Sequence, residues 1–341
     1  MIYQVGGCVR DEVMGRTPKD IDYVVVGASE KDMLDMGFQK VGADFPVYLH
    51  PATREEYALA RTEKKTGKGY LGFETYFGSD VTLEQDLERR DFTMNAMAKR
   101  NGDIVDPFDG QADIANGVIR HVNDKAFIED PVRILRAARF AARYDFIVDS
   151  ETVELIKSID VTEIDSVPRE RVMLELKKAL DDGKGYKFLS NLESFNDCIF
   201  CLFFGFCFGQ RLWAIDAVYK ELGMDGAMVL MAEIAENNFL TKNKASQDCK
   251  MLYTLITKAS QRHVFEPQDA FELIRMSDYY RRPQFLEQAD KYLKLTSINL
   301  VSVAMQLATV THEQFPELQG AEIGKAIQKK RKEVFDSILG L

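Results

Sequence analysis

The chain has 341 residues, of which 46% are hydrophobic, and its formal net charge at pH 7 is −10. This length and apolar content suffice for a substantial core and favour two or more domains over one. The acidic total argues against RNA binding through overall charge, so a nucleic-acid partner would require a local cluster of basic residues.

Short apolar segments separated by turns make up the first third of the chain. Five segments are rich in Val, Ile and Tyr and are bounded by Gly, Asp or Pro, which predicts β-strands. The predicted strands are Ile2–Val5, Tyr23–Val26, Val47–His50, Tyr57–Ala60 and Ile104–Val105, and the predicted helices between them are Asp11–Met14 and Glu30–Met36. Residues 1–110 are therefore expected to form a head with a mixed sheet and short helices.

Beyond Gly110, apolar residues recur at helical spacing. Two such stripes are Ile134, Leu135, Ala138, Phe140 and Ala141, and Val172, Leu174, Leu176 and Leu180. The pattern continues as far as Ile323–Leu339, so the remaining two thirds of the chain is predicted to be all-α and the fold class is α+β. We expect a helical neck over 111–190, a body over 191–260 and a tail over 261–341.

Five cysteines, an odd number at irregular spacing, argue against a disulfide framework. Reduced thiols in a cytoplasmic protein are the simpler expectation. Cys198 and Cys201 have the spacing of half a zinc site, but no second pair or nearby histidine completes it. The charged N-terminus is unlike a signal peptide, and the most apolar run, Cys198–Phe208, is too short to span a bilayer. We expect no membrane association and a buried position for this run.

A glycine pair and an acidic pair form the strongest local signal. Gly6 and Gly7 follow a predicted strand, so the backbone there can pass close to a bulky anion, with Arg10 as a further donor. Asp20 and Asp22 sit at the head of the next strand, where positions i and i+2 share a face. Two such carboxylates can hold Mg²⁺ while phosphate oxygens complete the coordination. Each motif alone is common in solvated turns, whereas the combination on successive strands is specific.

A third carboxylate from a neighbouring strand is common in phosphoryl-transfer sites. Glu55, Glu56 and Glu63 surround the predicted strand Tyr57–Ala60, and Glu56 has the best register. The alternative interpretation of Glu56 is a solvated strand end.

The segment Arg89–Ala96 places two arginines beside an aspartate, with Asn95 one helical turn further on. Arg89 and Arg90, with Asp91 and Asn95, could clamp a triphosphate and its ribose, because the planar guanidinium binds phosphate oxygens in pairs. The alternative is a helix start in which Asp91 is the cap and pairs with an arginine.

Arginines also recur every three residues after an acidic segment, at Arg133, Arg136 and Arg139. Pro131 suits a first helical turn, and Asp130 and Arg133 lie on one face. A carboxylate acceptor beside a guanidinium donor would complement cytosine and adenine and oppose uracil and guanine. The alternative is a capped helix with an ion pair between residues i and i+3.

These four motifs, in this order, resemble those of the class II tRNA nucleotidyltransferases, the CCA-adding enzymes, in the polymerase β-like superfamily that also holds bacterial poly(A) polymerases. The resemblance runs from Tyr3 to about Leu180 and is thin over 195–317. The matching segments are GGCVRD (6–11), KDIDYVVVG (19–27), DFPVYLHP (44–51), EEYALARTEKKTGKGY (55–70), LEQDLERRDFTMNAMA (83–98), DPFDG (106–110), EDPVRILRAARFAAR (129–143) and PRERVMLELKKAL (168–180).

The resemblance implies a polymerase β-like nucleotidyltransferase head and a role for each matching residue. The implied metal ligands are Asp20 and Asp22, and the strand register adds Glu56 as a candidate catalytic residue. The candidate nucleotide-binding residues are Gly6, Gly7, Arg10, Arg90, Asp91, Asn95, Asp130, Arg133, Arg136 and Arg139. Glu129 and Arg136 would support the pair Asp130 and Arg133, and 64–72 would be a flexible loop. Glu170, Arg171 and Glu175 fall in a structural neck motif. Gly324 and Lys325 could present a helix start to tRNA, or belong to a solvated terminal helix.

The activity implied is template-independent addition of C-C-A to the 3′ end of tRNA from CTP and ATP, using Mg²⁺, in a monomer or weak homodimer. The alternatives are a poly(A) polymerase, a partial CC- or A-adding enzyme, and a noncatalytic RNA-binding protein. Close bacterial relatives often carry a histidine-aspartate phosphohydrolase domain. The four histidines here include no His-Asp pair, so that activity is not expected.

Overall fold

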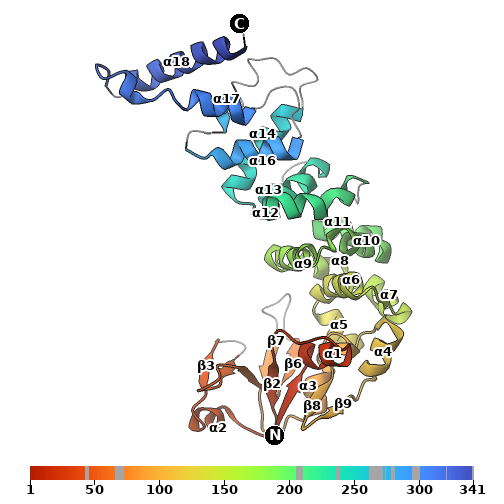
Figure 1. Cartoon of the computed structure of the whole chain (residues 1–341). Helices are drawn as coiled ribbons and strands as arrows, with labels where there is room; N and C mark the ends of the chain where they lie inside the picture. The colour runs from red at the N-terminus through yellow and green to blue at the C-terminus, as the bar shows by residue number, and fades with distance from the viewer. Residues whose placement is uncertain are drawn as a thin grey trace. The chain divides into compact units, whose positions relative to one another are not determined.

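The computed structural model describes residues 1–42, 46–65, 73–204, 210–235, 239–260, 272, 274–277, 281–293, 300–319 and 321–339. The chain divides into two compact units, Met1–Phe208 and Gly209–Leu341, whose elements are labelled in Figure 1. The predicted division into head, neck, body and tail is a finer one and stays a prediction.

A seven-stranded sheet among the described residues is the centre of the head (Figure 1). Its strand order is β3-β4-β5-β2-β1-β8-β9. The strands are β1 Ile2–Val5, β2 Asp22–Val25, β3 Gln39–Val41, β4 Val47–Leu49, β5 Glu56–Leu59, β8 Ala98–Arg100 and β9 Asp103–Val105. Only the β2–β5 pair among them is parallel. All five predicted strands are present, each within about one residue of the expected limits.

Apolar residues on both faces of the sheet pack against helices of the head. Val24 of β2 belongs to a buried cluster with Leu87 of α3 (Leu83–Glu88). Val25, the next residue, belongs to a second cluster with Met33 of α2 (Glu30–Asp35). Alternation along β2 thus directs successive side chains to opposite faces, as strand geometry requires.

Two smaller strand pairs lie outside the main sheet. β6 (Thr62–Lys65) and β7 (Phe73–Tyr76) form an antiparallel pair, and β10 (Val118–Ile119) pairs in parallel with β11 (Ile147–Val148). The predicted loop 64–72 therefore begins inside β6, and its residues 66–72 lie outside the described part of the chain.

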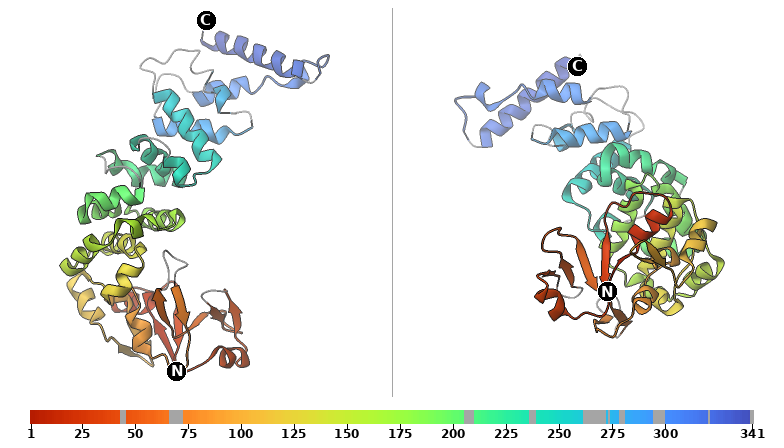
Figure 2. Two further views of the ribbon diagram at one scale, coloured as in Figure 1. Left: turned by 180° about the vertical axis from the view of Figure 1, so that it is seen from behind. Right: turned by 60° about the horizontal axis from the view of Figure 1, so that its bottom comes forward.

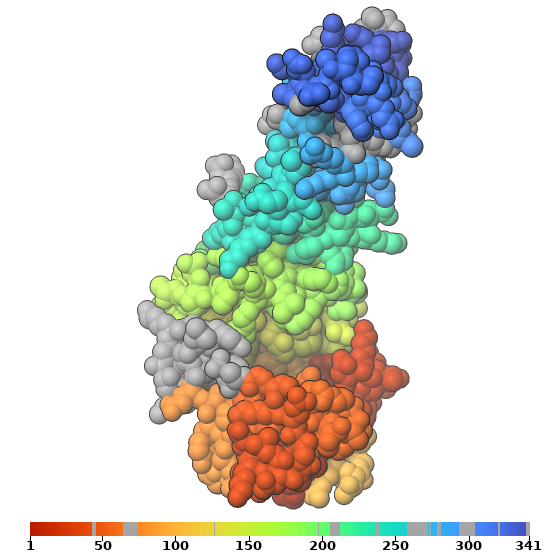
Figure 3. Space-filling model, turned by 90° about the vertical axis from the view of Figure 1, so that its left-hand side faces the viewer, coloured from red at the N-terminus to blue at the C-terminus, as the bar shows by residue number. Residues whose placement is uncertain are grey.

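The first unit also contains helices α1 Gly7–Val13, α4 Gly110–Asn116, α5 Asp124–Glu129, α6 Val132–Tyr144, α7 Ser150–Ser158, α8 Val161–Asp165, α9 Arg169–Asp181, α10 Gly185–Phe195 and α11 Asp197–Phe204. In Figures 2 and 3 the yellow helices lie beside the red and orange head, and the green helices follow beyond them. The buried stripe of α6, which includes Ile134, Leu135 and Ala138, packs against α9 and α10. The predicted helical face is confirmed.

The second unit is helical in its described parts. Its helices are α12 Ile215–Ile234, α13 Phe239–Lys242, α14 Gln247–Ser260, α16 Pro283–Leu293, α17 Leu300–Leu307 and α18 Ala321–Leu339, with short 3₁₀ turns at Gln210–Ala214 and His312–Gln314. None of the helices in the described ranges combines the length and apolar content that crossing a membrane requires. In the run 198–208, Phe200, Phe203 and Phe204 are buried as predicted, and residues 205–208 lie outside the described chain.

Candidate nucleotide-binding site

A pocket of about 470 Å³ lies where the first turn of the head meets the start of α6 and α9. Its lining residues are Gly6, Gly7, Arg10, Asp22, Arg89, Arg90, Asp91, Asn95, Asp130, Arg133, Arg136 and Arg171. All of these except Arg171 were predicted from the sequence to contact the nucleotide or a metal ion, Arg89 as one of the two arginines beside Asp91. Six arginines face three aspartates, so the lining carries an excess of positive charge on a chain whose total is negative.

Gly6 forms the turn between β1 and α1 with a φ of +73°, a conformation that a side chain disfavours. A Cβ at Gly6 would lie 2.6 Å from Nη1 of Arg90. The helix starts at once at Gly7, four residues earlier than predicted from Asp11, because Gly6 alone completes the turn. The glycine pair therefore brings the backbone and Arg90 together at the pocket.

Asp22 is the first residue of β2 and the only one of the three predicted carboxylates in the pocket lining. Asp20 lies in a bend before the strand, which begins only at Asp22 and pairs with β1 from Tyr23 onwards. The expectation that both aspartates lie on one extended segment is therefore wrong in that detail. Their charges are nevertheless close: burial raises the pKa of Asp22, Arg90 lowers it, and Asp20 raises it further.

Glu56 lies beside Asp22, because the parallel pairing of β2 with β5 matches their Cα atoms. Paired residues of neighbouring strands project to the same face, so Glu56 shares the face of Asp22. Among the described residues, no group of three or more His, Cys, Asp and Glu side chains is arranged to hold a metal ion by itself. A cation at Asp22 would thus need oxygen ligands from a substrate or from water, which is typical of Mg²⁺.

Asp86, which was not predicted from the sequence as a site residue, bonds both arginines that follow α3. Asp86 is completely buried and lies 2.7 Å from Nη2 of Arg89 and 3.2 Å from Nη2 of Arg90. It also accepts the backbone N–H of Arg61 at 3.2 Å. Burial alone would raise the pKa of Asp86, but the two guanidinium groups outweigh it and the pKa is lowered.

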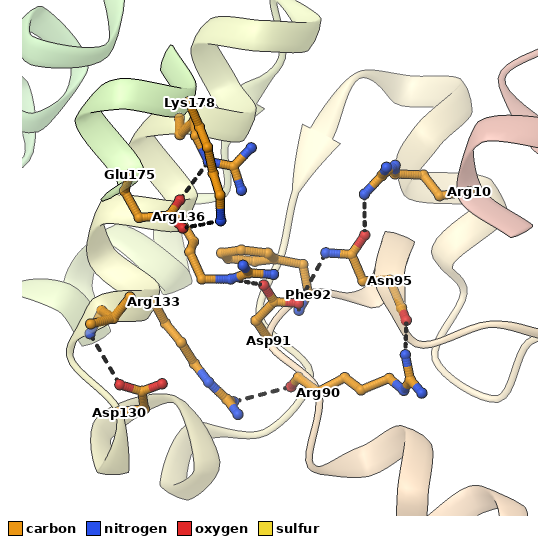
Figure 4. Close-up of polar contacts among 12 residues, drawn as sticks. Arg10, Arg90, Asp91, Phe92, Asn95, Asp130, Arg133, Arg136, Glu175 and Lys178 are labelled. Atoms are coloured by element: carbon orange, nitrogen blue, oxygen red, sulfur yellow. Dashed lines mark hydrogen bonds and ion pairs between the residues drawn. The ribbon is translucent and has the colours of Figure 1, made fainter. Parts of the chain in front are cut away.

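A chain of hydrogen bonds then connects Arg10 with α6 (Figure 4). Arg10 Nη1 donates to Asn95 Oδ1 at 2.7 Å, and Asn95 Nδ2 donates to Asp91 Oδ1 at 2.9 Å. Arg136 Nε donates to the other oxygen of Asp91 at 2.6 Å. Burial would raise the pKa of Asp91, but Arg136 and Arg133 lower it to about 2. Asp91 is therefore an ionised link between the head and α6, and it does not cap a helix.

Asp130 and Arg133 stand at the start of α6 and both line the pocket (Figure 4). Asp130 Oδ1 accepts the N–H of Val132 at 3.3 Å, but the N-cap of α6 is Pro131, so the prediction that Asp130 caps this helix is wrong. The expected ion pair between Asp130 and Arg133 is not the one that forms. Arg133 donates to the backbone oxygens of Arg89 and Arg90, at 2.6 and 3.1 Å, and Asp130 pairs with Arg171 of α9.

Arg139, predicted to bind the nucleotide, does not line this pocket, and Asp20 and Glu56 are also absent from the lining. Arg139 is 4% exposed, bonds Glu175 through Nε, and stacks over the ring of Phe140, so its guanidinium points toward α9 and away from the pocket. Direct nucleotide contact by Arg139 is therefore not supported. Gly324 and Lys325, predicted to contact tRNA, are exposed near the start of α18 in the second unit, and that role stays a prediction. One signal could have identified Arg171: a cation in the first turn of a helix is unfavourable unless a carboxylate pairs with it.

Comparison with known proteins identifies the family to which the chain is similar. Residues 2–120 match the family model described as the poly A polymerase head domain. A CCA-adding enzyme of Marinobacter nauticus is 40% identical, with 96% of each chain covered, and one of Pseudomonas putida is 38% identical, covering 96% of this chain and 90% of its own.

The fold agrees with these relatives. A crystal structure of the Bacillus stearothermophilus CCA-adding enzyme in complex with CTP matches with a TM-score of 0.68 at 21% identity, over 98% of this chain and 89% of that one. The chain belongs to the family of CCA-adding enzymes, as the sequence resemblance predicted, with the α+β fold of a nucleotidyltransferase head and helical domains.

Proposed function

We propose that the pocket adds C-C-A, one nucleotide at a time, to the 3′ end of tRNA from CTP and ATP with release of pyrophosphate. The observation that carries this proposal is the joint position of Asp130 and Arg133 in the same pocket as Gly6, Asp22 and Arg90. Groups suited to a triphosphate and groups suited to a base edge thus meet in one pocket. The full-length relatives named CCA-adding enzymes support the same activity.

The triphosphate would lie against the arginine side of the pocket. Arg90 and Arg10 present guanidinium groups beside the Gly6 turn, and Asp86 and Asn95 fix their orientation. Arginine forks bind phosphate oxygens in pairs, and preformed donors need no rearrangement as charge moves to the leaving pyrophosphate. These side chains therefore suit the binding of a nucleoside triphosphate.

The base would lie against Asp130 and Arg133. Cytosine and adenine both present an amino donor beside a ring-nitrogen acceptor, which a carboxylate and a guanidinium complement. Uracil and guanine present the reverse arrangement and would leave polar groups unmatched in the pocket. The protein itself could thus select C and A without a nucleic-acid template. A complex of a solved relative with CTP is in line with this role.

Asp20 and Asp22, with Glu56 beside them, fit the oxygen ligands that Mg²⁺ prefers, because the parallel register puts two of these carboxylates side by side. Metal ions bound there would supply the Lewis acidity that activates the tRNA 3′-hydroxyl and steadies the triphosphate, in the two-metal manner. The protein would contribute the alignment of the hydroxyl with the α-phosphate.

Contacts with tRNA beyond its 3′ end stay a prediction. Lys325 is exposed on α18, and Lys329 and Lys330 follow on the same exposed helix. Phosphate contacts from such lysines add sequence-independent affinity. A cytoplasmic location and a monomer or weak homodimer likewise stay predictions from the sequence.

Extension of a tRNA that lacks its last three nucleotides tests the proposal. With Mg²⁺, CTP and ATP, the purified chain should add three nucleotides and stop. Absence of extension, or equal use of UTP and GTP, would overturn it. A long A tail from ATP alone would instead identify a poly(A) polymerase, and a product of one or two added residues would identify a partial enzyme.

The substitution Asp20→Ala separates catalysis from binding. It should abolish turnover while the dissociation constant for tRNA stays within about twofold, since the proposed contacts with the tRNA backbone are made by cations elsewhere. Asp35→Ala, an exposed aspartate on α2, is the matched control. Equal loss of affinity and turnover would instead favour the noncatalytic RNA-binding alternative.

A further inference from the structure

Asp130 is held by a residue from another helix. Arg171, in the first turn of α9, donates Nη1 to Oδ1 and Nη2 to Oδ2 of Asp130, each at 3.0 Å. The two side chains are 28% and 24% exposed, so the pair lies at the wall of the pocket that both residues line. A planar guanidinium bonded to both oxygens stabilises the negative charge of the carboxylate and also fixes the plane in which the carboxylate lies.

The remaining hydrogen-bonding capacity of Asp130 can be counted. An ionised carboxylate offers about four lone-pair positions, two on each oxygen. Arg171 takes one on each oxygen, and the N–H of Val132 takes the second on Oδ1 at 3.3 Å. Within the described parts of the chain, one acceptor position is left, on Oδ2, and its direction is set by Arg171.

We propose that Arg171 is a positioning residue for base selectivity: it orients Asp130 so that a single oxygen acceptor meets the amino group of cytosine or adenine. This inference rests on the proposed function, in which Asp130 and Arg133 contact the base. A base with a carbonyl at that position offers no donor to Oδ2, and the mismatch lowers its affinity. A carboxylate free to turn about its side-chain bonds would offer several acceptor directions and discriminate less.

Lysine at position 171 distinguishes this role from simple charge. Its ammonium group keeps the positive charge beside Asp130 but is a point donor, so it cannot bond both oxygens in a fixed plane. Arg171→Lys should therefore lose selectivity almost as Arg171→Ala does. If charge alone mattered, lysine would restore the wild-type behaviour.

A matched control exists on the same pair of helices. Arg143, in the last turn of α6, lies 3.6 Å from Asp182, the residue after α9. This ion pair also joins α6 to α9, but neither residue lines the pocket. Arg143→Lys and Arg143→Ala therefore report the effect of weakening a contact between these helices without touching Asp130.

The experiment measures the dissociation constants of CTP and UTP by titration calorimetry, with Mg²⁺ and the full chain. The wild type and the Arg143 variants should prefer CTP, and Arg171→Lys and Arg171→Ala should lower that preference about tenfold or more. Affinity for tRNA and the thermal midpoint of the Arg171 variants should equal those of the Arg143 variants.

Three results would overturn the inference: no CTP preference in the wild type, an unchanged preference in the Arg171 variants, or an equal loss in the Arg143 variants. The extension assay tests the proposed function separately. A chain that fails to extend tRNA while Arg171→Lys loses its CTP preference would refute the proposed reaction and keep the role of Arg171.

Discussion

Replacing Asp86 by asparagine tests whether the two arginines of the pocket depend on one buried carboxylate. The change keeps the size of the side chain but removes its charge. The amide nitrogen of the new asparagine, a hydrogen-bond donor, would face a guanidinium group that is also a donor. Asp86 is fully buried and pairs with Arg89 at 2.7 Å and Arg90 at 3.2 Å. Loss of one partner in such a pair costs about 3–5 kcal/mol when both are buried. Because the arginine side chains are 20% exposed, we expect the lower end, about 3 kcal/mol.

Urea denaturation of the full chain, with the transition of the first unit followed by circular dichroism, measures this loss. A decrease of about 3 kcal/mol corresponds to a fall of roughly 6–12 °C in the thermal midpoint for a unit of this size. The affinity for CTP should fall as well, since Arg90 loses its orientation. The control is Glu84→Gln, an exposed carboxylate on the same helix. A loss below about 1 kcal/mol, or one no larger than that of the control, would refute the proposed anchoring.

Three further outcomes follow from the site. Gly6→Ala should weaken CTP binding about tenfold or more in calorimetry, because a Cβ would lie 2.6 Å from Arg90 in a positive-φ turn; unchanged affinity would contradict this. Arg133→Ala should relax the choice of C and A in single-nucleotide extension, whereas unchanged choice would remove the proposed base contact. The pKa of Asp91 is lowered to about 2, so this residue adds stability above its ordinary pKa near 4 that is lost as the pH falls toward 2. Asp91→Asn should flatten the dependence of the unfolding free energy on pH between 4 and 2, and an unaltered slope would argue against the ion pair with Arg136.

Contiguous motifs were predictable from the sequence because each one is a local pattern. Turn chemistry and strand alternation suffice to predict the turn at Gly6 and the aspartate at the start of β2. These residues and the arginines after α3 line one pocket. The helical stripe of α6 likewise predicted its buried face.

Contacts between distant segments could not be predicted in the same way. Asp130 and Arg171 are 41 positions apart, and their pairing depends on how α6 packs on α9. From spacing alone, Asp130 is expected to pair with Arg133, its neighbour on the helix. In the structure, Arg133 instead donates to the backbone oxygens of Arg89 and Arg90. Asp86 was different: it lies three and four positions before the arginines, a spacing that predicts helical ion pairs.

The same contacts explain how an acidic chain can bind an anionic ligand. The net charge of −10 describes the whole sequence, but a ligand in a confined pocket responds mainly to the charges that line it. There the three aspartates do not cancel the six arginines. Asp91 and Asp130 instead orient Arg136 and Arg171 through direct bonds, so the lining presents more arginines than aspartates to a ligand. A nucleoside triphosphate carries more negative charge than a monophosphate, so raising ionic strength should weaken the binding of CTP more than that of the monophosphate.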